Sequence, residues 1–77
     1  MDELVAEFAR RLVDEPDAVR VEQVEDEDGS LVFRLFVAEA DVGKVIGRQG
    51  RIARALRTVV RAGGVAAGQR LQLEIVD

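Results

Sequence analysis

The chain has 77 residues, 48% of them hydrophobic, with a net charge of −4 and with neither Cys nor His. This length and apolar content predict a single folded domain, and the missing Cys and His exclude disulfides, the commonest zinc ligands and the best side chain for proton transfer near neutral pH. No apolar run approaches the roughly 20 residues that span a bilayer, and the N-terminus is acidic rather than a basic signal region, so we expect a soluble, cytoplasmic protein.

The first predicted element is an amphipathic helix. Asp2 is a candidate N-cap, and apolar residues from Leu4 to Val13 recur at offsets of three and four. Pro16 ends the helix, because proline removes an amide donor and pushes Glu15 toward extended geometry.

Two strands joined by a tight turn follow the helix. Val19, Val21 and Val24 predict the first strand, and Asp28-Gly29 is a typical hairpin turn. The second strand has the clearest alternation, with one face formed by Leu31, Phe33, Leu35 and Val37.

From Asp41 onward the hydrophobic period becomes helical. Asp41 is a plausible N-cap for a short helix that ends at Gly47. A second helix begins near Gly50, and we expect Gly63-Gly64 to end it, because paired glycines provide a left-handed exit. Residues 71–75 alternate as a last strand.

The order helix, strand, strand, helix, helix, strand predicts an α+β fold. We expect a three-stranded sheet with the helices packed on one face. Within the single domain of residues 1–77, residues 1–40 form the helix and hairpin, and residues 41–77 form the two later helices and the last strand.

Charge is divided unevenly along the chain. Residues 1–40 hold twelve Asp and Glu against four Arg, whereas residues 41–77 hold seven Lys and Arg against three Asp and Glu. The stretch 44–61 contains six basic residues and no acidic one. Because binding to a polyanion depends on the local field, this stretch is the candidate nucleic-acid site. The acidic run 25–28 is most simply a solvated hairpin tip, or else a feature that repels RNA and orients it.

The motif Gly47-Arg48-Gln49-Gly50 is the distinctive feature of this stretch. Two glycines three residues apart let the backbone turn sharply and approach a ligand with no Cβ in the way. The N-terminus of the following helix offers amide groups and a partial positive charge, where phosphate binds readily. Lys44, Arg48 and Arg51 add full charges beside it.

Other candidates also have an ordinary structural interpretation. Val45, Ile46 or the exposed edge of the last strand are candidates to line an RNA groove, although apolar residues on helices usually belong to the core, as we expect for Ile46, Ile52, Leu56 and Val59. Arg54, like Arg57 and Arg61, is as readily a solvated helix surface as an RNA contact. With three Phe and no Trp or Tyr, recognition is expected to rest on backbone clamping rather than on base stacking.

The run from Asp41 to Arg57, with a helix on each side of the glycine loop, resembles the KH domain family. In that family the loop clamps about four nucleotides of a single strand. The element order fits the type II arrangement with a mixed sheet, and the whole chain resembles the KhpA family of small bacterial proteins made of one KH domain. One departure is Ala53, where many KH sequences carry a large aliphatic residue, and it puts base preference in question.

The resemblance implies single-stranded RNA binding, an RNA-chaperone or post-transcriptional role, no cofactor, and partnership with the larger KH protein KhpB. In some bacteria this pair is linked to cell-wall homeostasis and cell shape. A thin core also favours a homodimer. A protein-interaction adaptor and a ribosome- or rRNA-associated factor remain open alternatives. We expect no enzyme, because a chain without His or Cys cannot assemble a nucleophile–base pair.

Overall fold

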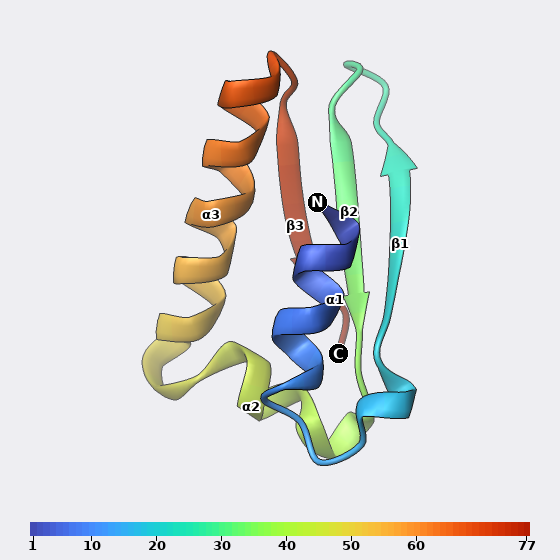
Figure 1. Ribbon diagram of the computed structural model, residues 1–77, viewed down its shortest axis with the longest axis vertical. Coiled ribbons are helices and arrows are strands. Elements are labelled where there is room, and N and C mark those ends of the chain that lie inside the picture. Colours follow the sequence, from blue (N-terminus) through green and yellow to red (C-terminus); the bar gives the residue numbers. More distant parts are fainter.

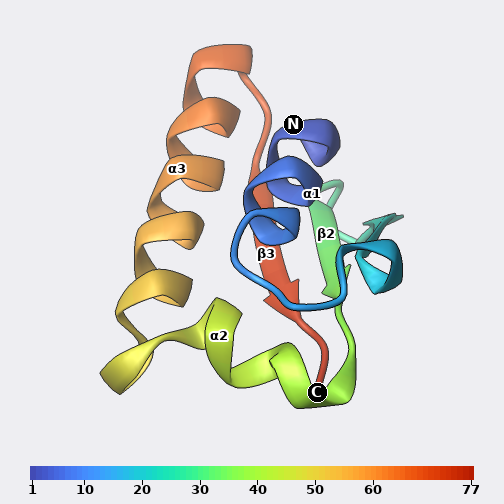
Figure 2. The same cartoon turned by 60° about the horizontal axis from the view of Figure 1, so that its bottom comes forward.

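The computed structural model describes residues 1–77. Its helices α1 and α3 lie on one face of a three-stranded sheet, and the short α2 lies at one end (Figure 1). The view turned by 60° keeps both long helices on the same side of the sheet (Figure 2). The elements are α1 (Asp2–Arg10), β1 (Arg20–Glu25), β2 (Leu31–Phe36), α2 (Val42–Ile46), α3 (Arg51–Ala67) and β3 (Leu71–Ile75), with short 3-10 turns at Pro16–Ala18, Glu39–Asp41 and Arg48–Gly50.

The sheet is mixed, with strand order β1-β2-β3. β1 runs antiparallel to β2, with Gln23 opposite Phe33. β2 runs parallel to β3, with Phe33 opposite Leu73, so the chain crosses over through α2 and α3 between these two strands. The predicted α+β architecture is therefore confirmed, and β3 is an edge strand beside α3.

The core lies between the sheet and the helices. Phe33 and Leu35 of β2 are 3% and 0% exposed, which confirms the face predicted from alternation. Each such side chain contributes about 1.5–3 kcal/mol when fully buried, so a nine-residue cluster gives a small domain only a modest reserve of stability. The cluster consists of Val5, Ala9, Phe33, Leu35, Val45, Leu56, Val60, Leu71 and Leu73.

α1 is shorter than its sequence pattern predicts. It ends at Arg10, and Leu12 and Val13 pack against the core from the turn that follows. Asp2 lies inside the first turn instead of capping it, and its carboxylate accepts a hydrogen bond from the Glu3 amide at 2.9 Å. The chain must leave the helix early to reach β1 across the core, and this requirement overrides the apolar spacing.

α3 is longer than predicted, because Gly63-Gly64 does not end it. The helix continues to Ala67, and Gly68 ends it in the left-handed conformation with φ 69°. Gly64 is buried where β3 passes closest, and a Cβ at this position would lie 2.9 Å from Leu71 Cγ. The glycine at position 64 therefore serves helix–strand packing rather than helix termination. None of the helices is both long and apolar enough to cross a membrane.

Candidate nucleic-acid interface

Gly47 has a backbone conformation that other residues rarely adopt, with φ 78° and ψ 170°. Its amide donates a hydrogen bond to the Gly43 carbonyl at 2.9 Å, which closes the last turn of α2. A Cβ on Gly47 would lie 2.7 Å from Ile52 Cγ1. The first glycine of the motif is therefore required by the fold itself.

Gly50 is different, since it faces open space. It has φ 73° and ψ 15°, a left-handed conformation that Asn and Asp also tolerate, and a Cβ there would meet nothing within 4 Å. Its amide donates to the Gly47 carbonyl at 3.1 Å. The second glycine leaves the entry to α3 accessible to a ligand.

Gln49 is the one non-glycine residue of the chain with positive φ, at φ 58° and ψ 24°. This conformation costs a residue with a side chain about 1–2 kcal/mol. Its exposed amide side chain accepts a hydrogen bond from Arg51 Nη2 at 3.4 Å. Two consecutive left-handed residues, Gln49 and Gly50, therefore turn the chain into α3, and strain of this kind often accompanies binding loops.

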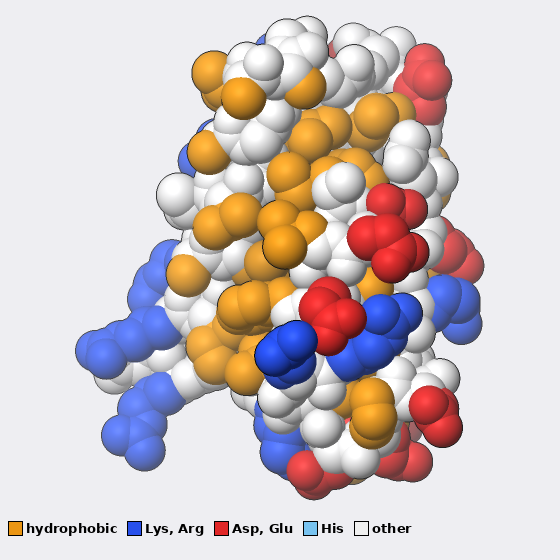
Figure 3. All heavy atoms as spheres, in the orientation of Figure 1, with side chains coloured by type: hydrophobic (Ala, Val, Ile, Leu, Met, Phe, Trp, Pro, Cys, Tyr) orange, Lys and Arg blue, Asp and Glu red, His pale blue; other side chains and the backbone are white.

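Ion pairing divides the eleven cations of the chain into two groups. Six of them pair with carboxylates, among them Arg70 with Asp28 at 3.1 Å and Arg34 with Glu74 at 2.9 Å. The remaining five are exposed, form no ion pair and lie in the loop or along α3 (Figure 3). We call them the unpaired arginines: Arg48, Arg51, Arg54, Arg57 and Arg61.

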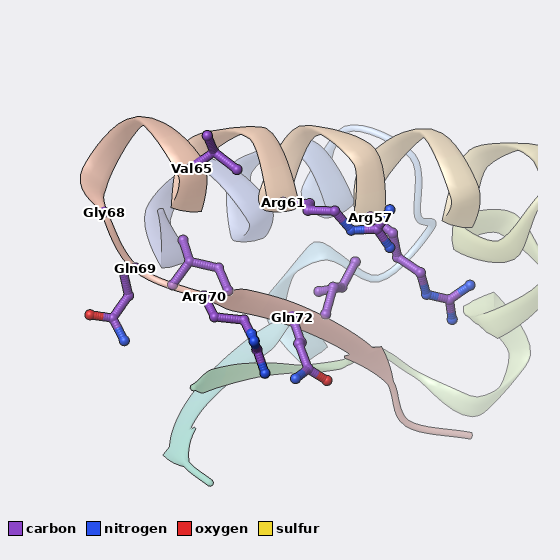
Figure 4. A pocket seen from close by; sticks show the side chains of 9 residues that line it. Arg57, Arg61, Val65, Gly68, Gln69, Arg70 and Gln72 are labelled. Carbon is purple, nitrogen blue, oxygen red and sulfur yellow. The ribbon is translucent and has the colours of Figure 1, made fainter. Parts of the chain in front are cut away.

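A groove of about 770 Å³ lies between α3 and the edge strand β3. Arg57 and Arg61 enter it from α3, Gln72 comes from β3, and Arg70 comes from the residue just before β3 (Figure 4). Leu71 is among the apolar residues that line it. The structure thus brings together the last strand and two arginines that sequence spacing alone did not link.

The predicted groove residues differ in accessibility. Val45 is 1% exposed and belongs to the core cluster, so its prediction as a groove residue is wrong. Ile46 is half-buried and stays a candidate. Ala53 is also buried, so it offers no exposed floor for a base, whereas Val59, which we expected in the core, is 48% exposed.

Lys44 does not extend freely toward the loop. Its Nζ lies 2.9 Å from Asp14 Oδ2 and 3.4 Å from Asp41 Oδ1. Asp41 occupies the N-cap position of α2 but makes no cap bond, and its other oxygen accepts a hydrogen bond from the Glu15 amide at 3.1 Å. Residue spacing could not predict this cluster, because Asp14 and Lys44 are 30 residues apart.

The carboxyl and ammonium groups of this cluster are both held in their charged forms. Burial would raise the pKa of Asp41, but hydrogen bonds from the amides of Glu15 and Asp14 and from Lys44 outweigh it and hold that pKa below 3.8. The hydrogen bond to Asp14 raises the pKa of Lys44 above its ordinary 10.5. Both groups are therefore charged at neutral pH.

The sequence model of the KhpA/KhpB KH domain matches residues 2–75. The chain belongs to this family. The protein named RNA-binding protein KhpA is 47% identical in Clostridium acetobutylicum, over 99% of this chain and 100% of the relative. In Bacillus subtilis it is 44% identical, over 100% and 94%, and in Aquifex aeolicus 48% identical, over 100% and 96%.

A solved structure supports the KH fold independently of these names. A crystal structure of Era from Aquifex aeolicus, bound to GDP and aluminium fluoride, superposes with a TM-score of 0.59. The match covers 96% of this chain and 28% of Era, at 22% identity. At this level of identity the likeness concerns the fold alone, and it agrees with the type II arrangement.

Proposed function

We propose that this chain is a non-catalytic, cytoplasmic KH domain that binds single-stranded RNA through the loop from Gly47 to Gly50. The unpaired arginines carry this proposal, since they begin in the loop and continue along α3. A polyanion gains most from cations that no carboxylate already neutralises. The KhpA relatives, which are named RNA-binding proteins, support it. Residues 1–77 then act as one domain, in an RNA-chaperone or post-transcriptional role.

The backbone contact falls on the middle of the loop. The amides of Gly47 and Gly50 already donate to carbonyl groups of the protein. The amides of Arg48 and Gln49 are therefore the proposed donors to phosphate oxygens. The side chains of Arg48 and Arg51 add charge-assisted contacts beside them.

The bases lie in the groove between α3 and β3. Arg54, Arg57 and Arg61 keep the backbone near α3, while the edge of β3 and Gln72 offer polar groups to the bases. Ile46 supplies aliphatic contact near the loop. Since no aromatic side chain lines the groove, binding is of modest affinity and tolerant of sequence.

Gly50→Asp tests the loop directly. The backbone accepts Asp at this φ and no atom obstructs it, so the fold persists while the new carboxylate repels phosphate. We expect the variant to lose binding to a short fluorescent oligouridine in an anisotropy titration, with an unchanged circular dichroism spectrum.

Gly29→Asp is the matched control. Gly29 also has positive φ, 85°, and open space around its Cβ, but it lies in the β1–β2 hairpin. The Gly29→Asp protein should bind RNA as the wild type does. Equal binding by a folded Gly50→Asp protein would contradict the loop contact and favour a protein-interaction adaptor instead.

A second copy of the chain is the proposed protein partner. Figure 3 shows a band of hydrophobic side chains between α1 and α3. Leu4 and Phe8 of α1 are 54% and 41% exposed, and Val59 of α3 is 48% exposed. Ala55 and Ala62 lie on the same face of α3 as Val59, four residues before it and three after it, and are exposed. We call Leu4, Phe8, Ala55, Val59 and Ala62 the apolar stripe.

Charge complementarity favours an antiparallel pair of copies. α1 carries Asp2 and Glu3 in its first turn, whereas the start of α3 carries Arg51 and Arg54. The N-terminus of α1 lies beside the second half of α3, where Met1 reaches Gly63. When two copies pair through the apolar stripe about a two-fold axis, the basic start of α3 in one copy therefore lies near the acidic start of α1 in its partner. The KH domain of a KhpB-like protein, which the same family model covers, is the competing occupant.

A further inference from the structure

Lys44 differs from every unpaired arginine, although it lies only three residues before the loop. Its ammonium group contacts two carboxylates, at 2.9 Å on Asp14 and 3.4 Å on Asp41. Arg48, in contrast, is exposed and forms no ion pair. When a phosphate approaches, the charge of Arg48 is therefore available, whereas the charge of Lys44 is already paired.

We propose that Lys44, Asp41 and Asp14 form a cluster that positions the glycine loop, and that Lys44 does not contact RNA phosphate. This replaces the phosphate contact that the position of Lys44 in the sequence predicted. The inference rests on the proposed RNA-binding function of the loop and deepens it, because it divides the basic residues into those that bind and one that positions.

The short helix before the loop needs such an anchor. α2 has only five residues, and a helix of that length is not stable through its own hydrogen bonds. Val45 in the core and the cluster around Asp41 both fix it to the rest of the domain. Gly47 donates its amide to Gly43, within the same turn as Lys44, so a shift of this turn would move the entry to the loop.

The burial of Asp41 keeps Lys44 in place. The Asp41 side chain is 2% exposed, and one of its oxygens is already engaged by the Glu15 amide. If Lys44 turned toward RNA, a buried carboxylate would lose its only cationic partner, which is strongly unfavourable. Arg48 gives up no such partner, so phosphate binds to Arg48 and not to Lys44.

The salt dependence of RNA binding separates the two roles. Each phosphate contact to a single strand contributes about 0.7 to the slope of log affinity against log salt. With a labelled oligouridine, Arg48→Gln should reduce the slope by about 0.7, whereas Lys44→Gln should weaken binding several-fold and leave the slope unchanged. Lys44→Arg keeps a cation beside both carboxylates and should restore affinity. A loss of slope in Lys44→Gln equal to that in Arg48→Gln would overturn the proposal.

Asp14→Asn distinguishes the two possible roles of Lys44, because they predict different changes in affinity and in salt dependence. If Lys44 were an RNA contact restrained by Asp14, the substitution would release it, and both affinity and slope would increase. If the cluster positions the loop, affinity stays equal or falls, and the slope does not change. Asp14 is exposed, so this variant retains the contact between Lys44 and the buried Asp41 and should fold.

A measurement without RNA keeps this inference separate from the proposed function. Hydrogen exchange of the Gly47 amide reports the bond that closes α2. It should exchange several-fold faster in Lys44→Gln and in Asp14→Asn than in the wild type, and at the wild-type rate in Arg48→Gln. Unchanged exchange in Lys44→Gln would refute the positioning role even if RNA binding holds. Faster exchange with no RNA binding by the wild type would refute the proposed function alone.

Discussion

Asp41 is almost inaccessible to solvent, yet it is charged at neutral pH. The amide of Glu15 and the ammonium group of Lys44 each engage one of its oxygens. These partners replace the water that the carboxylate loses on burial. A single residue therefore joins α2 to the segment between α1 and β1, across 26 positions of sequence.

Asp41 should make the free energy of unfolding depend on pH in the acidic range. Because the pKa of Asp41 is lowered below 3.8, its contribution is present above that pH and is lost as the pH falls through the lowered pKa. The raised pKa of Lys44 places the loss of its contribution above pH 10.5. Urea unfolding from pH 3 to 9 should therefore find Asp41→Asn less stable than the wild type at neutral pH, with a difference that narrows below pH 3.8. A constant difference would contradict this assignment.

The glycine motif combines two requirements that look identical in the sequence. Gly47 must be glycine because its backbone and Ile52 leave no room for a Cβ. Gly50 has room for a side chain, so its glycine matters for what approaches from outside. The motif was therefore recognisable from spacing, but only the structure distinguishes the residue that holds the fold from the one that keeps the site open.

At the scale of elements, α3 has two exposed faces of opposite character. Arg57 and Arg61 occupy the side toward β3, and Ala55, Val59 and Ala62 occupy another exposed side. The sequence predicted Val59 as core because the apolar arc of the helix is continuous. The core uses only part of this arc, and the remainder contributes the α3 residues of the apolar stripe.

Local patterns predicted most elements, and tertiary contacts account for the errors. Alternation in 31–37 predicted β2 and its buried face correctly, because each strand face meets one environment. The five residues of α2 could not reveal that Val45 faces the core, since so short a helix has no clear period. The Asp14–Lys44 contact was invisible for a different reason, as it joins segments that only folding brings together.

Gly63 and Gly64 of α3 test the distinction between local sequence patterns and tertiary contacts. A Cβ at Gly63 meets only the free end of Met1, so Gly63→Ala should gain helix propensity and raise the free energy of unfolding by up to about 1 kcal/mol. A Cβ at Gly64 meets the start of β3, so Gly64→Ala should lower the free energy of unfolding by about 1–3 kcal/mol. Urea denaturation measures both, and equal effects would contradict the packing role of Gly64.

At the scale of the whole molecule, the division of charge along the sequence becomes a division in space. The paired cations lie among the carboxylates of α1, the sheet and the turns, while the unpaired arginines gather around the loop and α3 (Figure 3). A net negative protein can therefore present a positive face to RNA. The acidic hairpin at 25–28 lies at the end of the sheet away from α2 (Figure 1), which favours approach by the loop end.

Self-association through the apolar stripe can be tested with two valines of similar exposure. Val59→Glu places a charge in the stripe, whereas Val24→Glu places it on β1, where Val24 is 44% exposed. Light scattering coupled to gel filtration should find a dimer for the wild type and Val24→Glu, and a monomer for Val59→Glu, because a buried unpaired charge opposes association. A monomeric wild type would leave a KhpB-like KH domain as the occupant. A dimeric Val59→Glu protein would exclude this surface.

The most direct test of RNA binding through the glycine loop is to measure how salt changes the affinity of the wild type and of one loop variant. Anisotropy titrations with a short single-stranded RNA should give a slope near −2 in log affinity against log salt, as expected for about three phosphate contacts. Arg48→Asp combined with Gln49→Asp should lose binding, because Asp fits the left-handed backbone at position 49 while repelling phosphate. Arg11→Asp with Gln23→Asp makes the same change of charge just after α1 and on β1 and should bind as the wild type does, whereas equal binding by the loop variant would contradict loop-mediated RNA recognition.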